Sequence, residues 1–466
     1  MRFLLLFISL CLLTSLCVSQ DQLPQQLRYE LKTAGIPLEA VSLYAVNLEK
    51  NQLLLDVNSK EPRNPASVMK LVTTLSALEI LGPNFHWKTE ISYRGQLKES
   101  TLFGDLIVKG FGDPSLTLEQ FWILLNKIRS RGIQKIKGNV IIDRSFFDIP
   151  YHNPSEFDGK PFRPYNLGPD AFLVNFNSIK VTIVPDKKNK NIKIYSMPTF
   201  KNIKIKNKLK WSMRSCWSWP DTPKLVKENV VFEGLYSSKC GVKQRYYSML
   251  SPDLYTAEIF KKIWKQLGGS IEGQILNGIK NSSDSFLLDH RSFPLTHILR
   301  TLNKHSNNVT ARHIFLTLAY EQNNGKSVST EKARAKISTW LKSIGLSPSE
   351  IIVENGSGLS RISRISAYQI GMILQRAWDS PLMPEFISSL PIIATDGTMR
   401  MRMRNTDLKG MGHMKTGYLK GTRTIAGFLK NKKKETLLVV CFINHPKAKN
   451  SWPIHKKLLT WLYERT

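Results

Sequence analysis

The sequence predicts an α+β protein that folds into two or three compact units. Its 466 residues exceed the usual length of one domain. Segments in which apolar residues recur with the helical period alternate with short apolar runs bounded by turn residues, which are typical of strands. Between residues 180 and 247 the composition shifts to lysine-rich alternating segments, which indicates a small β-rich module with one basic face.

The first 19 residues have the pattern of a secretory signal peptide. One basic residue, Arg2, precedes a short apolar run that ends near the small residue Ser19. We expect export and cleavage after Ser19, with an uncleaved anchor or a lipid on Cys17 as the alternatives. The remaining chain keeps about +30 of its net charge of +31, which favours peripheral contact with an anionic envelope. Export argues against nucleic acid as the partner.

The next elements are a short helix, a hairpin and a central helix. The apolar stretches 41–48 and 52–57 flank a turn-like break and predict the hairpin. Pro65 suits a helix entry, and Gly82 and Pro83 end the helix predicted over 66–81. Apolar residues surround most of this cylinder, so we expect it to be buried.

The remaining elements are predicted in the same way, from the helical period and from short apolar runs that are typical of strands. The stretches 121–128, 254–267 and 294–321 have the helical period, and 138–143 reads as a strand. The C-terminal third alternates helices with strands. It ends in an amphipathic helix over 452–462 that should cover a sheet rather than lie on a membrane.

Three cysteines follow the signal segment. Export permits a disulfide between Cys216 and Cys240, which would close a modest loop in a stretch with little apolar core. Cys441 lies within an apolar run and reads as a buried strand residue. The spacings contain no paired CxxC motif, so they predict no zinc site. We expect no metal and no cofactor.

Ser67 and Lys70 lie one helical turn apart at the start of the central helix. A serine hydroxyl needs a base to become a nucleophile, and lysine serves as that base only when its pKa falls well below about 10.4. The motif is weak alone, because Ser329 and Lys332 repeat it where we expect Ser329 to cap a helix. A capping role is an alternative for Ser67 as well. The choice between capping and catalysis depends on the other motifs of the chain.

Two further motifs follow in order, Ser306-Asn307-Asn308 and Lys415-Thr416-Gly417. The order Ser-x-x-Lys, Ser-x-Asn, Lys-Thr-Gly is typical of penicillin-binding proteins and class A β-lactamases. Shorter stretches, including Gly112-Asp113-Pro114, Asn355-Gly356-Ser357-Gly358 and Asp396-Gly397-Thr398, narrow the match. The chain resembles the D-alanyl-D-alanine carboxypeptidase/endopeptidase family of low-molecular-mass penicillin-binding proteins. Within that family it is most similar to the class C, penicillin-binding protein 4 type (peptidase family S13).

The resemblance implies a β-lactamase/transpeptidase-like domain, in which helices flank a five-stranded antiparallel sheet. Residues 20–86 and 288–466 would form it. An inserted domain II would comprise 87–179 and 248–287, with a β-rich basic domain III, 180–247, nested within it. The composition shifts lie near the same places.

The resemblance also implies an exported serine D-Ala-D-Ala carboxypeptidase or DD-endopeptidase of the periplasm or cell envelope. Its substrates would be peptidoglycan stem peptides, and β-lactam antibiotics would acylate it. The sequence does not separate the two peptidase activities, and it leaves a homodimer open. Two other functions are a catalytically silent wall-binding or scaffold protein and a β-lactam-hydrolysing enzyme. The intact motifs count against the first, and no motif specifies the fast deacylation that the second needs.

The family pattern assigns a role to each motif residue. Ser67 would attack the penultimate D-alanine carbonyl, and Lys70 would take its proton. Ser306 would relay a proton to the leaving amine, while Asn308 would hold the Lys70 amine and the substrate amide. Lys415 would add a cation that lowers the proton affinity of Lys70.

The third motif would bind the terminal carboxylate of the substrate. Lys415, Thr416 and the strand at Gly417 would contact it, and the backbone N–H groups of Ser67 and Tyr418 would form the oxyanion hole. Tyr418 departs from the family pattern, which has a small hydroxyl residue at this position. We therefore expect activity with altered carboxylate recognition.

Two residues would meet the substrate's side chain. Arg361 matches a family arginine that faces a carboxylate there, with a buried structural ion pair as the alternative. Asn175 stands where the family carries an aspartate that binds this side chain. Because asparagine is uncharged, recognition of a charged substrate side chain is less expected here. We expect structural roles for His305 and His413, and a turn at Asp396.

Overall fold

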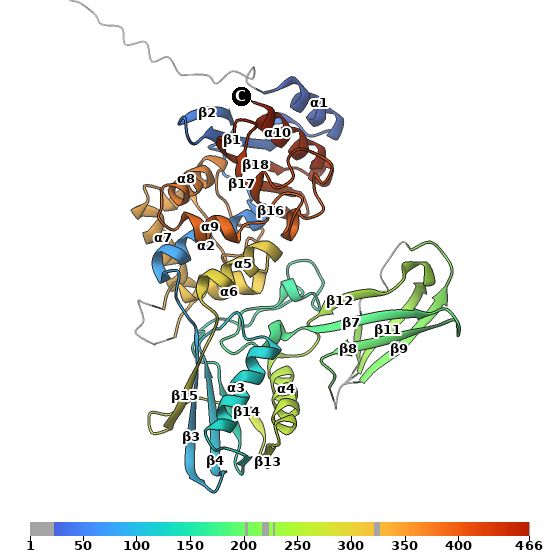
Figure 1. Ribbon diagram of the computed structural model, residues 1–466, viewed down its shortest axis with the longest axis vertical. Helices are drawn as coiled ribbons and strands as arrows, with labels where there is room; N and C mark the ends of the chain where they lie inside the picture. Colours follow the sequence, from blue (N-terminus) through green and yellow to red (C-terminus); the bar gives the residue numbers. More distant parts are fainter. Residues whose placement is uncertain (1–22, 201–203, 217–222, 227–228, 321–326, 466) are drawn as a thin grey trace, which may run out of the picture.

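The computed structural model describes residues 23–200, 204–216, 223–226, 229–320 and 327–465 (Figure 1). The signal peptide predicted over 1–19 lies outside them. Within the described ranges, no helix combines the length and the apolar character needed to cross a bilayer.

A five-stranded antiparallel sheet joins the two ends of the chain. Its strands, in spatial order, are β16 (Gly412–Leu419), β17 (Thr422–Lys430), β18 (Thr436–Asn444), β1 (Val41–Asn47) and β2 (Gln52–Val57). The predicted hairpin is the β1–β2 pair. This sheet confirms the transpeptidase-like fold.

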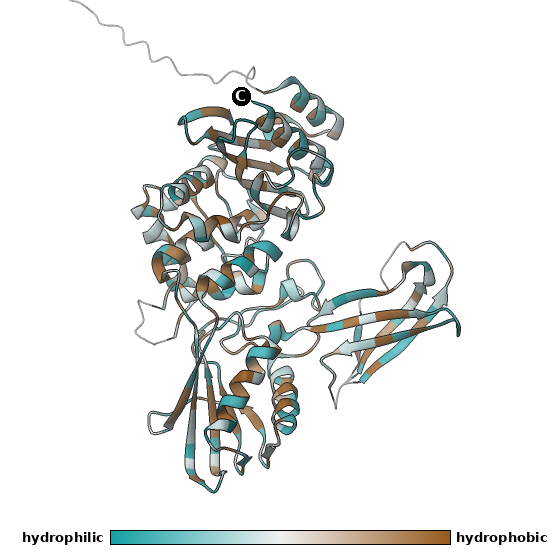
Figure 2. Ribbon diagram, viewed as in Figure 1, coloured by the Kyte–Doolittle hydropathy of each residue, from teal (hydrophilic) through white to brown (hydrophobic). Residues whose placement is uncertain are grey.

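Helices cover both faces of this sheet, which explains the continuous apolar run in β18. Leu438, Val440 and Phe442 face one core, whereas Leu437, Val439 and Cys441 face the other. The second core is closed by α1 (Gln25–Ala34) and α10 (Trp452–Glu464), so the C-terminal amphipathic helix covers a sheet as predicted. Figure 2 shows the apolar residues along the middle strands of this sheet.

The helices on the first face surround the predicted central helix. This helix begins with the 3-10 turn η3 (Ala66–Val68) and continues as α2, in which ten successive residues are buried. The helices are α2 (Met69–Leu81), α5 (Leu295–His305), α6 (Asn308–Thr317), α7 (Thr330–Ser343), α8 (Ala367–Trp378) and α9 (Met383–Ser389).

The helical stretch predicted over 294–321 is in fact two helices. Ser306 adopts a left-handed conformation, with φ at 55°, which ends α5. The side chain of Asn307 then accepts hydrogen bonds from the N–H groups of Val309 and Thr310 and caps α6. The periodic pattern continues across this break, because both helices bury apolar residues in the same core.

A second part of the chain is inserted between α2 and α5. It contains a seven-stranded sheet of β3 (Lys88–Lys98), β4 (Thr101–Gly110), β5 (Lys135–Ile136), β6 (Val140–Asp143), β13 (Ser270–Ile271), β14 (Ile275–Asn277) and β15 (Ser285–Arg291). Helices α3 (Leu118–Ser130) and α4 (Pro252–Gln266) share its apolar core.

The lysine-rich stretch forms two three-stranded sheets. One contains β7 (Ile179–Asp186), β8 (Asn191–Met197) and β12 (Lys243–Tyr247). The other contains β9 (Lys204–Ser212), β10 (Lys224–Val226) and β11 (Asn229–Ser237). A disulfide joins Cys216 to Cys240, with 5.0 Å between their Cα atoms, whereas Cys441 is free and buried in β18. Figure 1 shows this module extending sideways from the inserted sheet. The predicted domain boundaries stay predictions.

Candidate active site

Ser67 lies in the single 3-10 turn that leads into α2, and the cap position of α2 is Val68. Its hydroxyl accepts a hydrogen bond from the Lys70 amine, with 3.1 Å between Oγ and Nζ. The capping alternative for Ser67 is therefore wrong. The second Ser-x-x-Lys copy behaves differently, because Ser329 accepts from the backbone N–H of Lys332 and caps α7, as predicted.

Lys70 is fully buried and has only neutral acceptors. Besides Ser67, its Nζ donates to Asn308 Oδ1 at 2.8 Å and to the carbonyl of Ser357. Burial first, and then the cations Lys415 and Arg312, hold the pKa of the Lys70 amine well below its ordinary value. The neutral amine is thereby favoured. Its two N–H bonds then serve Asn308 and Ser357, and its lone pair faces the Ser67 hydroxyl and can accept the proton.

Lys415 forms a second lysine–serine pair. Its Nζ donates to Ser306 Oγ and to the carbonyl of Thr416, both at 2.9 Å. Burial and the neighbouring Arg402 lower the pKa of Lys415 to about 7. Thr416 donates its hydroxyl to Thr398 at 3.0 Å. The left-handed conformation of Ser306 thus presents its hydroxyl to the strand that carries the third motif.

The site also contains residues from the inserted part. The Asn308 amide nitrogen donates to the carbonyl of Tyr165 at 3.2 Å. Arg312, one turn along α6, donates to the carbonyl of Leu167 at 2.6 Å and is buried. Burial lowers the pKa of Arg312 to about 10, and Glu354 acts in the opposite direction, so the guanidinium remains charged at neutral pH.

Sequence patterns did not predict Arg312, Ser357 or Tyr165 as parts of the site. For Arg312 a signal existed, because it lies four residues after Asn308 on the same helix face. Ser357 and Tyr165 contribute backbone carbonyls, which any residue type could supply.

Two glycines allow the motifs to meet. A Cβ added at Gly417 would lie 2.9 Å from both the Ala66 Cβ and the Pro65 carbonyl oxygen. A Cβ at Gly358, whose φ is 74°, would collide with the carbonyl of Ala66. Glycine therefore lets β16 and the 355–359 loop lie directly against the turn that carries Ser67.

The residues expected to meet substrate differ in their placement. The Tyr418 side chain is 61% exposed, and the Arg423 guanidinium lies 3.4 Å from its ring centroid. The Arg361 guanidinium lies 4.4 Å from the ring centroid of Phe157, and its side chain is exposed. The structural ion pair considered for Arg361 is therefore wrong.

Asn175 makes its hydrogen bonds within the inserted part. Its amide donates to the Ser178 carbonyl at 3.1 Å and to the Tyr255 hydroxyl at 2.8 Å. Among the described residues it has no hydrogen bond to the three motifs. The structure thus brings together Ser67, Lys70, Ser306, Asn308 and Lys415, but it gives Asn175 no contact with them.

Two of the three remaining polar candidates, His413 and Asp396, have structural partners. His413 Nδ1 lies 3.1 Å from the Ile387 carbonyl. Asp396 pairs with Lys304 at 2.7 Å and accepts the N–H of Ile392 at 2.8 Å. His305 is exposed on the last turn of α5. In the part of the chain that the structure describes, no three His, Cys, Asp or Glu side chains cluster as metal ligands.

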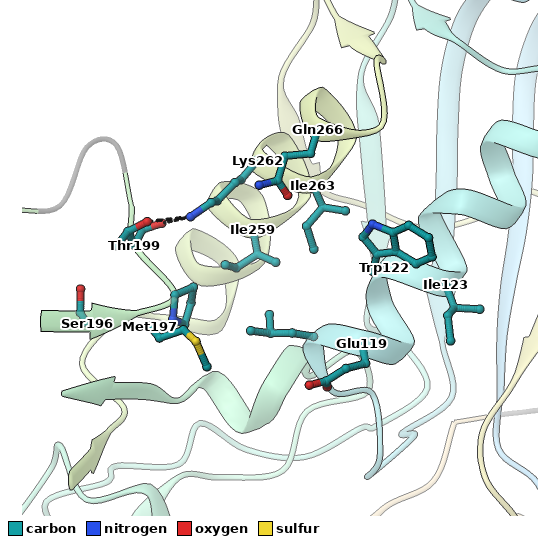
Figure 3. Close-up of a pocket in the computed structure, with 12 residues that line it drawn as sticks. Glu119, Trp122, Ile123, Ser196, Met197, Thr199, Ile259, Lys262, Ile263 and Gln266 are labelled. Atoms are coloured by element: carbon teal, nitrogen blue, oxygen red, sulfur yellow. Dashed lines mark hydrogen bonds between the residues drawn. The ribbon is translucent and has the colours of Figure 1, made fainter. Parts of the chain in front are cut away.

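An apolar cavity of about 600 Å³ lies elsewhere, between α3, α4 and the end of β8 (Figure 3). Trp122, Met197, Ile259 and Ile263 line it, and Lys262 at its edge donates to the Thr199 hydroxyl at 2.7 Å. This contact between a hydroxyl and an amine is exposed, whereas Lys70 beside Ser67 is fully buried, and none of the three motifs lines the cavity. The cluster around Ser67 is therefore the candidate active site.

Comparison with known proteins agrees with this geometry. The model of the D-Ala-D-Ala carboxypeptidase 3 (S13) family matches residues 23–464. The chain is 26% identical over 412 residues to the D-alanyl-D-alanine carboxypeptidase DacB of Haemophilus influenzae, covering 87% of this chain and 85% of that protein. It is 22% identical to the D-alanyl-D-alanine carboxypeptidase of Actinomadura sp. strain R39, covering 78% of this chain and 70% of that protein.

Solved structures match over nearly the whole chain. The crystal structure of penicillin binding protein 4 from H. influenzae superposes with a TM-score of 0.80 at 24% identity, covering 94% of this chain and 99% of that one. The same protein complexed with a β-lactam gives a TM-score of 0.75, covering 94% of this chain and 100% of that one. Because the family model spans nearly all described residues, the chain belongs to the S13 family of D-Ala-D-Ala carboxypeptidases.

Proposed function

We propose that this protein is a serine D-Ala-D-Ala carboxypeptidase or DD-endopeptidase that cleaves peptidoglycan stem peptides through an acyl-enzyme on Ser67. The observation that supports the proposal most is the hydrogen bond between the Ser67 hydroxyl and the buried amine of Lys70. All acceptors around that amine are neutral, and two buried cations lower its pKa. A serine nucleophile and its base are thus adjacent.

In the first step Lys70 takes the Ser67 proton while Oγ bonds to the carbonyl carbon of the penultimate D-alanine. The carbonyl oxygen becomes an oxyanion, which the backbone N–H groups of Ser67 and Tyr418 stabilise. Such donors are each worth about 3–4 kcal/mol in comparable enzymes.

In the second step the peptide C–N bond breaks. Ser306, hydrogen-bonded to Lys415, relays to the leaving amine the proton that Lys70 took from Ser67, and Asn308 holds the Lys70 amine in place. Water then gives a proton to the neutral Lys70 and bonds to the ester carbonyl carbon. The ester C–O bond breaks, the shortened peptide leaves with a new carboxyl group, and Lys70 returns the proton to Ser67. A free D-alanine leaves in the carboxypeptidase reaction and a cross-linked peptide amine in the endopeptidase reaction.

The substrate carboxylate would meet protonated Lys415, Thr416 and the strand at Gly417. The Tyr418 ring lies against Arg423, so its hydroxyl does not replace the small hydroxyl of the family pattern, although its backbone N–H is retained. The exposed guanidinium of Arg361 would meet a carboxylate on the substrate side chain. Contact between Asn175 and that side chain remains a prediction.

We place this activity in the periplasm or cell envelope, following export by the segment 1–19. Acylation by β-lactams is expected, because they resemble the D-Ala-D-Ala unit and react at the same serine. A relative's crystal structure complexed with a β-lactam supports this expectation. A β-lactamase would also need a water-activating group for deacylation, and the contacts around Ser67 provide no separate one.

The test is release of D-alanine from a stem pentapeptide that ends in D-Ala-D-Ala, alongside release of cross-linked dimers. We expect activity in the wild type and its loss in Ser67→Ala. The matched control is Ser329→Ala, which removes the serine of the second Ser-x-x-Lys copy and should retain activity. Activity in Ser67→Ala equal to that of the wild type would exclude the proposed nucleophile. A folded wild type that cleaves neither peptide would favour the silent wall-binding protein.

A further inference from the structure

The β-rich module has an unusual share of the positive charge. Residues 180–247 contain sixteen lysine and arginine residues against four aspartates and glutamates, so this short stretch contributes +12 to the total of +31. A charge concentrated in this way creates a local field that attracts an anionic partner.

Within the module, the lysines of β9 lie on one face. Lys204, Lys206, Lys208 and Lys210 alternate with Ile205, Asn207 and Leu209, and all four lysines are exposed. Alternate side chains of a strand point to the same face, about 7 Å apart. Val230, Phe232 and Tyr236 of the paired strand β11 belong to the core on the opposite face, together with Ile205 and Leu209.

The neighbouring strands extend this basic face and add apolar side chains to it. Lys224 of β10 pairs with Val231 of β11, and Val231 pairs with Lys206 of β9. Lys224 therefore lies on the same face as the lysines of β9. The single carboxylate on this face of the described strands, Glu233, pairs with Lys224. Leu235 lies beside Lys210 and is 51% exposed.

The outer face of the other sheet is different. It carries Lys180 and Lys193 among mostly uncharged residues, and Lys193 pairs with Asp186 at 3.0 Å. The four exposed lysines of β9 therefore concentrate positive charge on one of the two outer faces. We call the face of β9, β10 and β11 that carries Lys204, Lys206, Lys208, Lys210 and Lys224 the lysine face.

We propose that the lysine face binds the surface of an anionic phospholipid bilayer. Several ammonium groups on one face complement the headgroups, and Leu235 among them offers apolar contact with the acyl boundary. A soluble polyanion would use only the charges, whereas a bilayer would use both the charges and this apolar contact. The proposal is independent of the chemistry at Ser67.

A competing explanation is that the lysines protect sheet edges. β9 and β10 are the outer strands of their sheet, and lysines on outer strands hinder unwanted strand pairing. This explanation predicts aggregation when the lysines are removed, and no effect on vesicles.

The experiment is co-sedimentation of the full chain with phosphatidylcholine vesicles, with and without phosphatidylglycerol. We expect binding only to the anionic vesicles, weakened by salt. Each lysine at such a surface is worth roughly fivefold in affinity, so neutralising three should weaken binding on the order of 100-fold. The test variant is the triple Lys204→Gln, Lys206→Gln, Lys208→Gln.

The matched control removes three exposed lysines from the turn between β17 and β18, in the triple Lys432→Gln, Lys433→Gln, Lys434→Gln. It changes the net charge equally and should retain vesicle binding. Replacing the same three β9 lysines with arginine should also retain binding, which shows that the fold tolerates change on this face. Melting temperatures check that each variant is folded.

Several outcomes would overturn the proposal. Equal losses in the two glutamine triples would mean that net charge alone acts. Unchanged vesicle binding with aggregation of the β9 triple would assign the lysines to edge protection. Binding of the wild type to insoluble peptidoglycan but not to vesicles, lost in the β9 triple, would assign the face to the wall polymer.

Discussion

At the scale of single residues, three buried basic side chains lie around the proposed nucleophile. Lys70, Lys415 and Arg312 are all buried, and Lys415 and Arg312 each lower the pKa of Lys70. Because the amine of Lys70 acts as a base only when neutral, the acylation rate should rise with pH through the pKa of Lys70. Lys70 and Lys415 interact, so the limb of this profile reports the coupled pair.

Lys415→Met should move the acidic limb of the acylation profile to higher pH. With one cation removed, protonated Lys70 forms more easily and its pKa rises, so a higher pH is needed for the free base. The shift is partial, because burial remains the largest cause of the lowered pKa. The variant should also bind peptides with a free terminal carboxylate more weakly. Stopped-flow acylation across pH, with carboxylate and amidated peptides, measures both effects. An unmoved limb with weaker peptide binding would reduce Lys415 to a substrate contact.

Arg312→Met should move the same limb in the same direction but less far, because Lys415 contributes more than Arg312 to the lowered pKa. The pH at which the acidic limb lies tests the electrostatic role of Arg312. The rate alone does not, because losing the hydrogen bond to Leu167 also affects the rate. Arg334→Met is the control: Arg334 likewise donates to backbone carbonyls, at Val353 and Glu354, and does not act on Lys70. If the acidic limb lies at the same pH in the wild type and in Arg312→Met, the role of Arg312 is purely structural.

At the scale of secondary-structure elements, the site depends on three elements that pack closely against one another. The η3 turn, strand β16 and the 355–359 loop meet at Ala66, and this contact depends on Gly417 and Gly358. The sequence predicted the hairpin, the central helix and the C-terminal helix, because each follows from local periodicity. It did not predict the break at Ser306, because the apolar pattern continues across it into one core.

Gly417→Ala should slow acylation roughly tenfold or more while the protein remains folded. The added methyl would collide with the Thr424 hydroxyl and press on Ala66 and Pro65. Overpacking of this kind typically costs about 1–3 kcal/mol, which is roughly five- to 150-fold in rate when it falls on the reacting geometry. Gly278→Ala is the control, because its methyl would meet only the Ile141 side chain in the inserted sheet. Wild-type acylation in Gly417→Ala would show that the close approach does not matter.

At the scale of the whole molecule, the two chain ends build one sheet, and the site draws on the part inserted between them. The contacts of Asn308 with Tyr165 and of Arg312 with Leu167 join α6 to the inserted part. These contacts span more than a hundred residues of sequence, so no local pattern reveals them. Motif order could reveal the candidate catalytic residues, whereas the carbonyls that accept their hydrogen bonds could be identified only in the folded chain.

Breaking the disulfide should loosen the basic module and leave the catalytic part intact. Cys216 and Cys240 are 24 residues apart in the chain, and a loop of this size stabilises by about 3 kcal/mol. We expect faster amide exchange in β9 and β11 of Cys216→Ser/Cys240→Ser, with unchanged exchange in α2. Cys441 should resist alkylation until unfolding, since burial raises the pKa of its thiol. Faster exchange in α2 would show that the parts unfold together.

The central claim is that Ser67 is the acylated nucleophile, and the most direct measurement is the mass of the intact protein after incubation with a penicillin. We expect a long-lived increase equal to the mass of the antibiotic, with the adduct mapped to the peptide that contains Ser67. Ser67→Ala should show no increase, and Ser329→Ala should be labelled like the wild type. An adduct on a different serine, or labelling of Ser67→Ala at the wild-type rate, would contradict the account.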